Sequence, residues 1–200
     1  MAMNSREYAQ YRQTKIESGL LYQDFVVDCC WRLLGLAIVQ FSSRAYQTTV
    51  GESLTGVEIK HDERMAQTGN LWIELAEKAV PRPGEYAKSG IRRDDNTWLY
   101  AIGNYDVIYL FAKRFLVALG EARKSDGAHT YKHLENNTQT SLGYLLPSRD
   151  AERYAAVILR PNAEKRVEKV LGDLHALGRA LHEIAKAEIA GQLLLFENQP

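Results

Sequence analysis

The sequence predicts an α/β fold, with a mixed β-sheet flanked by helices and a long C-terminal helix. Three features predict it: apolar residues at helical spacing near the N-terminus, short β-branched and aromatic runs separated by turns, and an Ala-, Glu- and Leu-rich stretch late in the chain. The length suits one domain. We expect a domain over residues 1–160, a long amphipathic helix over 161–190 that packs on it, and a flexible tail over 191–200.

The range 6–36 predicts the first helix, because its apolar residues recur every three or four positions. These residues are Tyr22, Phe25, Val26, Cys29, Cys30, Leu33 and Leu34. The two cysteines are adjacent and lack the spacing of a zinc site, so we expect buried thiols.

Short apolar runs predict strands at 37–41, 57–61, 71–75, 98–102, 106–111 and 142–146. We expect extended chain at 46–50, a turn at 51–56, a helix at 113–123 and a loop at 124–140. Alternation of sheet and helix along the chain indicates a mixed sheet with helices against it.

The composition is that of a folded globular protein, with 46% hydrophobic and 25% charged residues. Because 25 basic residues balance 25 acidic ones, a nonspecific nucleic-acid coat protein, which would be basic, is disfavoured. No apolar run is long enough to span a membrane, and the polar N-terminus lacks a secretion signal. We therefore expect a cytoplasmic protein with no membrane partner.

Glu58 and Lys60 lie two apart in the strand expected at 57–61, so their side chains share a face. Glu52, in the turn before this strand, adds a second carboxylate. Two carboxylates are suitable ligands for Mg²⁺, with Mn²⁺ as a substitute, and the metal polarises a phosphate. A neighbouring ammonium stabilises the charge that develops on the phosphate. The pattern suits phosphodiester hydrolysis with Glu52, Glu58 and Lys60 as catalytic residues, although Glu-x-Lys alone is also common on a solvated strand face. Its position after a helix and a strand, within the expected central sheet, favours the catalytic interpretation.

The segment 51–62 (GESLTGVEIKHD) resembles the metal-binding hairpin of PD-(D/E)XK nucleases. Segments 68–74 and 88–91 look like parts of phage and bacterial members of that superfamily, and 98–111 looks like the strand pair that follows. The resemblance covers about 22–119. It implies a restriction-endonuclease-like fold and metal-dependent chemistry on nucleic acid, with Glu58 as a metal ligand and Lys60 as the motif lysine. Glu52 stands in place of the first acid without a Pro-Asp pair, and Asp24 and Asp28 are the alternatives.

Further polar residues follow the motif. Glu74 is a candidate supporting carboxylate, although it would also suit a solvated strand face. Lys88, Arg92 and Arg93 are candidate contacts to DNA phosphates, or else part of a solvated loop. His129 and His133 lie four apart without a third ligand, so a metal site there is not expected.

The C-terminal tail carries Gln192, Leu193, Leu195 and Phe196, which resemble the Gln-Leu-x-Leu-Phe peptide that binds bacterial sliding clamps. In that resemblance Gln192 makes polar contacts, and Leu195 and Phe196 fill a pocket. The alternative is that this apolar tail packs on its own domain.

Together these features predict a Mg²⁺-dependent endonuclease or exonuclease that acts on DNA. One alternative is a catalytically weak or inactive nuclease-fold adaptor that binds nucleic acid or the replication sliding clamp. Another is an oligomeric accessory protein of a phage or mobile element. The long C-terminal helix would also suit a homodimer.

Overall fold

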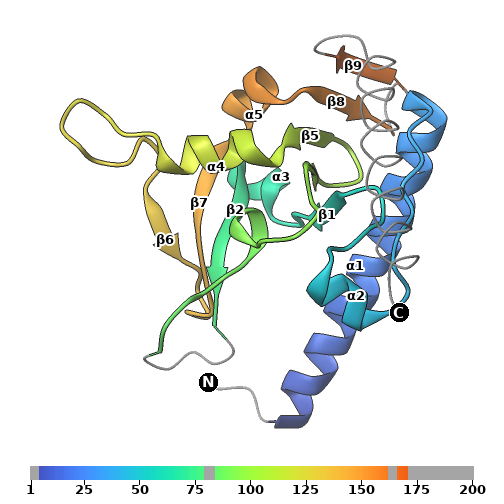
Figure 1. The fold of residues 1–200 in the computed structure, drawn as a ribbon, viewed down its shortest axis with the longest axis horizontal. Helices are drawn as coiled ribbons and strands as arrows, with labels where there is room; N and C mark the ends of the chain where they lie inside the picture. The colour runs from blue at the N-terminus through green and yellow to red at the C-terminus, as the bar shows by residue number, and fades with distance from the viewer. Residues whose placement is uncertain (1–4, 79–83, 162–165, 171–200) are drawn as a thin grey trace, which may run out of the picture.

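The structure, a computed structural model, describes residues 5–78, 84–161 and 166–170 and contains two β-sheets with helices around them (Figure 1). The five-stranded sheet has the order β1-β4-β5-β8-β9 and is mixed, because β1 and β4 run parallel whereas the other pairs are antiparallel. The four-stranded sheet has the order β3-β2-β7-β6 and is antiparallel. The expected mixed α/β class is confirmed.

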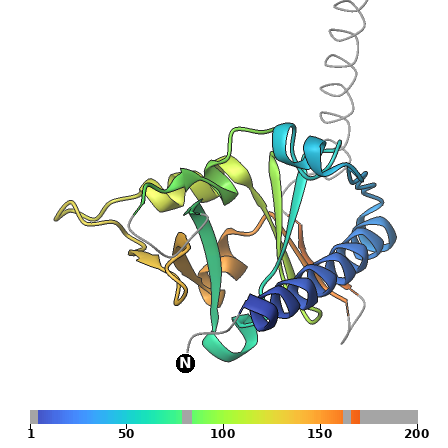
Figure 2. The same ribbon diagram turned by 90° about the horizontal axis from the view of Figure 1, so that it is seen from below.

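The five-stranded sheet is built from β1 (Val57–His61), β4 (Leu99–Gly103), β5 (Ile108–Ala112), β8 (Val157–Arg160) and β9 (Arg166–Val170). Helix α1 (Ser5–Leu34) lies along one face of it, as Figure 2 shows. Val57 and Ile59 of β1 pack on this side, together with Tyr22, Val26 and the buried Cys29 and Cys30 of α1. The buried thiols are as expected.

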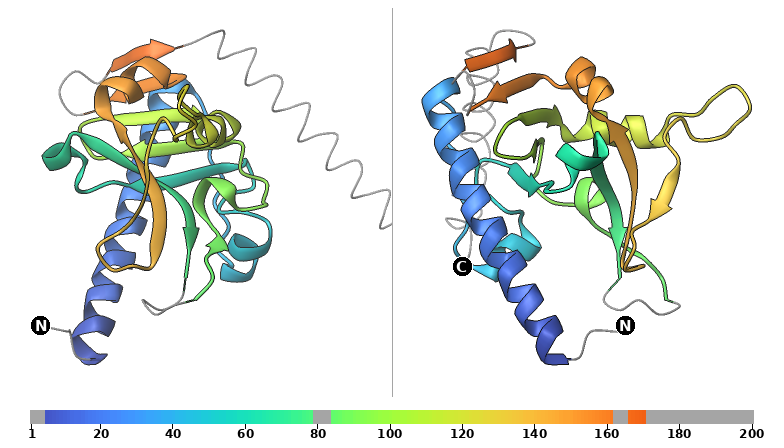
Figure 3. Two further views of the ribbon diagram at one scale, coloured as in Figure 1. Left: turned by 90° about the vertical axis from the view of Figure 1, so that its left-hand side faces the viewer. Right: turned by 180° about the vertical axis from the view of Figure 1, so that it is seen from behind.

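The four-stranded sheet lies on the opposite face of the first sheet and consists of β2 (Asn70–Glu77), β3 (Ala87–Lys88), β6 (His133–Glu135) and β7 (Ser141–Pro147). Leu71, Ile73 and Leu75 of β2 pack against Tyr100 and Ile102 of β4 in a second apolar core. Helices α4 (Lys113–Glu121) and α5 (Ser148–Tyr154) close this core. Figure 3 shows the segment between α4 and β6 projecting from the body.

Short helical elements complete the fold. Helix α2 (Arg44–Thr49) precedes β1, α3 (Met65–Thr68) joins β1 to β2, and the 3-10 helix η1 (Gly90–Arg92) follows β3. Within the described residues no helix is both long and apolar enough to cross a membrane.

The segment between α1 and β1 differs from the sequence expectation. Residues 37–41 form no strand but only one bridge, between Gln40 and Ser53, and the expected extended chain at 46–50 is largely α2. Burial alternates from exposed Ala37 to buried Ile38 and half-exposed Val39, but the run forms no ladder with a strand beyond the single bridge, so it is not part of a sheet. The Gln47 side chain also donates a hydrogen bond to Phe41 O at 2.6 Å, which stabilises the helical turn.

The late part of the chain also differs. Residues 166–170, expected in the long helix, form β9, because pairing with β8 satisfies their backbone and Val167 packs at the edge of the α1 core. Similarly, β6 lies inside the expected loop at 124–140. The remainder of the expected helix, 171–190, and the tail 191–200 lie outside the described residues.

Candidate active site at the edge of the mixed sheet

A tight turn precedes β1 and places Glu52 beside it. Ser53 Oγ accepts a hydrogen bond from Val57 N and donates one to Val57 O, both at 2.8 Å. Gly56 has a φ of +67°, and a Cβ there would lie 2.6 Å from Asn96 O, so the turn needs glycine. The turn is held to the segment just before β4 by the Asn96 amide, which donates to Ser53 O at 2.8 Å.

Glu52, Glu58 and Lys60 meet on the face of β1 that is turned away from α1. Lys60 Nζ lies 2.9 Å from Glu58 Oε1 and 3.2 Å from Glu52 Oε1. Glu58 is 1% exposed, whereas the Lys60 side chain is 39% exposed and Glu52 is partly buried. The two carboxylates therefore share one ammonium at the boundary between the core and solvent.

Three side chains that the sequence patterns did not indicate belong to this site. Tyr100, which pairs with Glu58 in the β1–β4 register, donates a hydrogen bond to Glu58 Oε1 at 3.0 Å. Lys113, at the start of α4, donates to Asp95 Oδ1 and to Arg93 O, each at 2.6 Å. Asp95, which was also missed, accepts a second hydrogen bond from Arg93 Nε.

Arg93 connects the two groups, because its Nη2 lies 4.0 Å from Glu58 Oε2. We call the whole set the ion-pair cluster. It consists of Glu52, Glu58, Lys60, Arg93, Asp95 and Lys113. Three carboxylates face three cationic side chains, so the ion-pair cluster is electrically balanced.

The charge states in the cluster follow from its electrostatics. Burial lowers the pKa of the Lys60 ammonium, but Glu58, Tyr100 and Glu52 raise it by more, so the pKa lies well above its ordinary 10.5. Burial and Glu58 raise the pKa of the Tyr100 phenol. Burial raises the pKa of Asp95, but hydrogen bonds from Lys113 and Arg93 lower it further, below its ordinary value. At neutral pH Lys60 is a cation, Tyr100 is a neutral donor and Asp95 is ionised.

The site offers carboxylate oxygens to a hard cation. Glu58 Oε2 is buried and has no hydrogen-bonding partner among the described residues, and Glu52 is held close by through Lys60. Oxygen ligands of this kind suit Mg²⁺. No group of three or more His, Cys, Asp or Glu side chains with ligand geometry occurs in the described ranges. Glu52 and Glu58 are the two carboxylates here that could hold such a cation, and a site with two protein carboxylates leaves positions for waters, several of which Mg²⁺ commonly keeps.

The other candidate acids lie elsewhere. Asp24 and Asp28 are on α1, which covers the opposite face of the sheet, and both are exposed. Asp28 is paired with Arg32 at 2.7 Å. Glu74, on β2, accepts hydrogen bonds from Ser89 and Ser141, each at 2.7 Å. The structure therefore brings Glu52, rather than these three residues, to Glu58.

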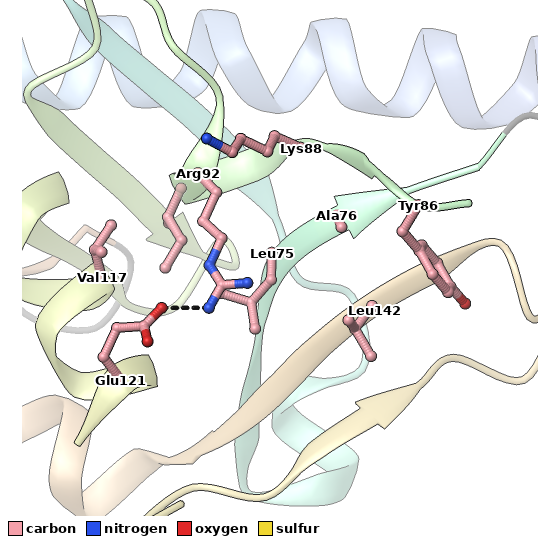
Figure 4. A pocket seen from close by; sticks show the side chains of 9 residues that line it. Leu75, Ala76, Tyr86, Lys88, Arg92, Val117, Glu121 and Leu142 are labelled. Atoms are coloured by element: carbon pink, nitrogen blue, oxygen red, sulfur yellow. Dashed lines mark hydrogen bonds and ion pairs between the residues drawn. The ribbon is translucent and has the colours of Figure 1, made fainter. Parts of the chain in front are cut away.

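The candidate DNA-contacting residues separate into two places. Arg93 turns into the ion-pair cluster, whereas Lys88 and Arg92 line a different pocket of about 650 Å³ (Figure 4). The floor of this pocket is apolar, with Leu75 and Leu142 among its residues, and Arg92 pairs with Glu121 of α4. Of the three candidate DNA-contacting residues, Arg93 is therefore the one near Glu58.

His129 and His133 stack on each other, with ring centroids 4.1 Å apart. Among the described residues they join no group of three potential metal ligands.

No family model, no curated protein and no solved structure matches this chain.

Proposed function

We propose that this chain is a Mg²⁺-dependent nuclease of the PD-(D/E)XK type that hydrolyses phosphodiester bonds in DNA. The observation that carries the proposal is the convergence of Glu52 and Glu58 on Lys60, at 3.2 and 2.9 Å, at a partly exposed sheet edge. Two acids and one lysine on a strand and its preceding turn are also the set that the resemblance to this superfamily requires.

The charge of the site supports an anionic substrate. The ion-pair cluster is balanced, so a divalent cation held by Glu52 and Glu58 gives it a net positive charge. A positive site that is partly shielded from water attracts phosphate groups strongly. When bound, Mg²⁺ supplies charge and Lewis acidity to the phosphate.

The chain's own residues have separable roles in this proposal. Glu58, held by the Tyr100 hydroxyl, is the fixed metal ligand, and Glu52 is the second. Lys60 is protonated in this environment, so it donates hydrogen bonds and stabilises developing negative charge rather than removing a proton. The side chains that face α1 from the same strand only anchor it in the core.

The arrangement of elements is compatible with the restriction-endonuclease-like fold that we propose. An N-terminal helix covers one face of a mixed sheet, and the motif strand β1 lies at the edge of this sheet and pairs with β4, which in turn pairs with β5. The proposal retains the resemblance of residues 192–196 to a clamp-binding peptide.

The proposal is tested by incubating the purified protein with supercoiled, linear, single-stranded and branched DNA in Mg²⁺, Mn²⁺ or EDTA. We expect metal-dependent cleavage of at least one substrate, lost in Lys60→Ala and in Glu58→Ala. Lys88→Ala, which changes a lysine outside the ion-pair cluster, should cleave its substrate at the same turnover rate under saturating DNA. Equal cleavage by wild type and Lys60→Ala would assign the activity to a contaminant or another site.

A second candidate function is a non-catalytic adaptor that uses the same fold to bind nucleic acid or a sliding clamp. The observation that favours it is the balance of the ion-pair cluster, which needs no cation to compensate its charges. Binding of DNA without cleavage of any of the four substrates, in either metal, would favour the adaptor.

A further inference from the structure

Arg93 and Glu58 present two polar atoms to each other without completing a hydrogen bond. Arg93 Nη2 and Glu58 Oε2 lie 4.0 Å apart, which is an ion pair but exceeds hydrogen-bonding distance. Both atoms are buried, and neither has a hydrogen-bonding partner among the described residues. The carboxylate that holds Oε2 is 1% exposed. Unsatisfied buried atoms on charged groups are costly, so this juxtaposition suits a ligand that completes both.

Asp95 and Lys113 hold Arg93 in this orientation. Its Nε donates to Asp95, and Asp95 also accepts from Lys113, which in turn donates to Arg93 O at 2.6 Å. The Asp95 and Lys113 side chains are 1% and 11% exposed, so the support lies inside the protein. The guanidinium therefore keeps one nitrogen fixed in the protein and directs another toward Glu58.

The geometry points to Arg93 as a metal-linked phosphate-binding residue: it neutralises Glu58 in the metal-free protein and binds a phosphate oxygen of the DNA when Glu58 holds a divalent cation. This inference rests on the proposed nuclease function. Arg93 competes with the cation for Glu58, because both are positive and both face Oε2. Once a cation satisfies Glu58, the Arg93 nitrogen is available to a phosphate, which guanidinium groups bind well.

The inference predicts effects of opposite sign on two ligands. In Arg93→Gln, loss of the competing charge should tighten Mn²⁺ binding by about tenfold, measured by calorimetry without DNA. The same variant should weaken binding of a short fluorescein-labelled DNA duplex in Ca²⁺ by about tenfold, measured by anisotropy. A purely structural role would weaken both ligands, because a loosened site binds neither well.

Arg92→Gln is the matched control, since Arg92 is the adjacent arginine and pairs with Glu121 instead. It should leave Mn²⁺ binding within about twofold of wild type. Arg93→Lys keeps the positive charge and tests the inference if Arg93→Gln folds poorly. It should leave Mn²⁺ binding close to wild type and still weaken DNA binding, because an ammonium cannot reach both Asp95 and the phosphate.

The outcomes separate this inference from the proposed function. Tighter Mn²⁺ binding with weaker DNA binding in Arg93→Gln supports the inference. Wild type that binds Mn²⁺, together with Arg93→Gln constants that are unchanged or both weaker, overturns the inference alone. Wild type that binds no divalent cation overturns the proposed function, and this inference with it.

Discussion

Replacing Lys60 by methionine tests how the ion-pair cluster responds to the loss of its shared cation. The change keeps most of the aliphatic stem but leaves Glu58 Oε1, otherwise 2.9 Å from the ammonium, with only the Tyr100 hydroxyl. Breaking a fully buried pair costs about 3–5 kcal/mol. Because Lys60 is 39% exposed and Arg93 still faces Glu58, we expect a smaller loss of unfolding free energy, about 1–2 kcal/mol.

This loss should appear as a fall in melting temperature of about 2–8 °C in EDTA, measured by calorimetry or circular dichroism. Mg²⁺ should then stabilise Lys60→Met more than wild type, because the cation no longer competes with the ammonium for the two carboxylates. A ligand at 100 times its Kd contributes about 2.7 kcal/mol, enough to offset the loss. Lys88→Met, at an exposed strand position, should change the melting temperature little. The reasoning is refuted if Lys60→Met melts like wild type in EDTA, or if Mg²⁺ stabilises neither protein.

Three further predictions address the support of the site and the tail. Asp95→Asn should lower the free energy of unfolding at neutral pH and make it less dependent on pH in acid. The lowered pKa of Asp95 contributes stability that is present above pH 3.8 and is lost as the pH falls through the folded-state pKa. Equal pH profiles of the two proteins in urea titrations would contradict this. Gly56→Ala should lower the free energy of unfolding in urea by more than about 2 kcal/mol, because the new Cβ would lie 2.6 Å from a backbone oxygen. Gly69→Ala, at a similar φ with nothing within 4 Å, should lose only the free energy of the backbone strain. Equal losses in the two variants would contradict the steric explanation. A peptide of residues 191–200 should bind a bacterial sliding clamp in a fluorescence titration. Binding that Phe196→Ala leaves unchanged would contradict this and favour the alternative, in which the tail packs on its own domain.

The part of the site that could be predicted from sequence is the part encoded by local alternation. Glu58 and Lys60 share a face because side chains alternate along a strand. Glu52 lies only six residues before Glu58, so the intervening turn is short enough to place both carboxylates at Lys60. Tyr100 could not be found in this way, because its contact with Glu58 depends on the register of β1 against β4. A 42-residue separation along the chain carries no periodic signal for such a pairing.

The strand at 166–170 could not be predicted from the local composition. Its residues continue a composition that favours helix, but pairing with β8 and an ion pair between Arg160 and Glu168 favour the extended form. Tertiary contacts thus outweigh intrinsic propensity, which differs by less than about 1 kcal/mol per residue among most residues. Arg93 was expected only as a contact to DNA phosphates or as part of a solvated loop, because its partner Lys113 lies 20 residues away along the chain.

Anomalous X-ray scattering from crystals of the protein grown with Mn²⁺ tests most directly whether Glu52 and Glu58 hold a metal ion. We expect one strong peak within about 2.3 Å of carboxylate oxygens of both Glu58 and Glu52, on the face of β1 turned away from α1. A peak shared by Glu58 with Asp24 or Asp28, or crystals with fully ordered Glu58 and no peak beside it at saturating Mn²⁺, would contradict it.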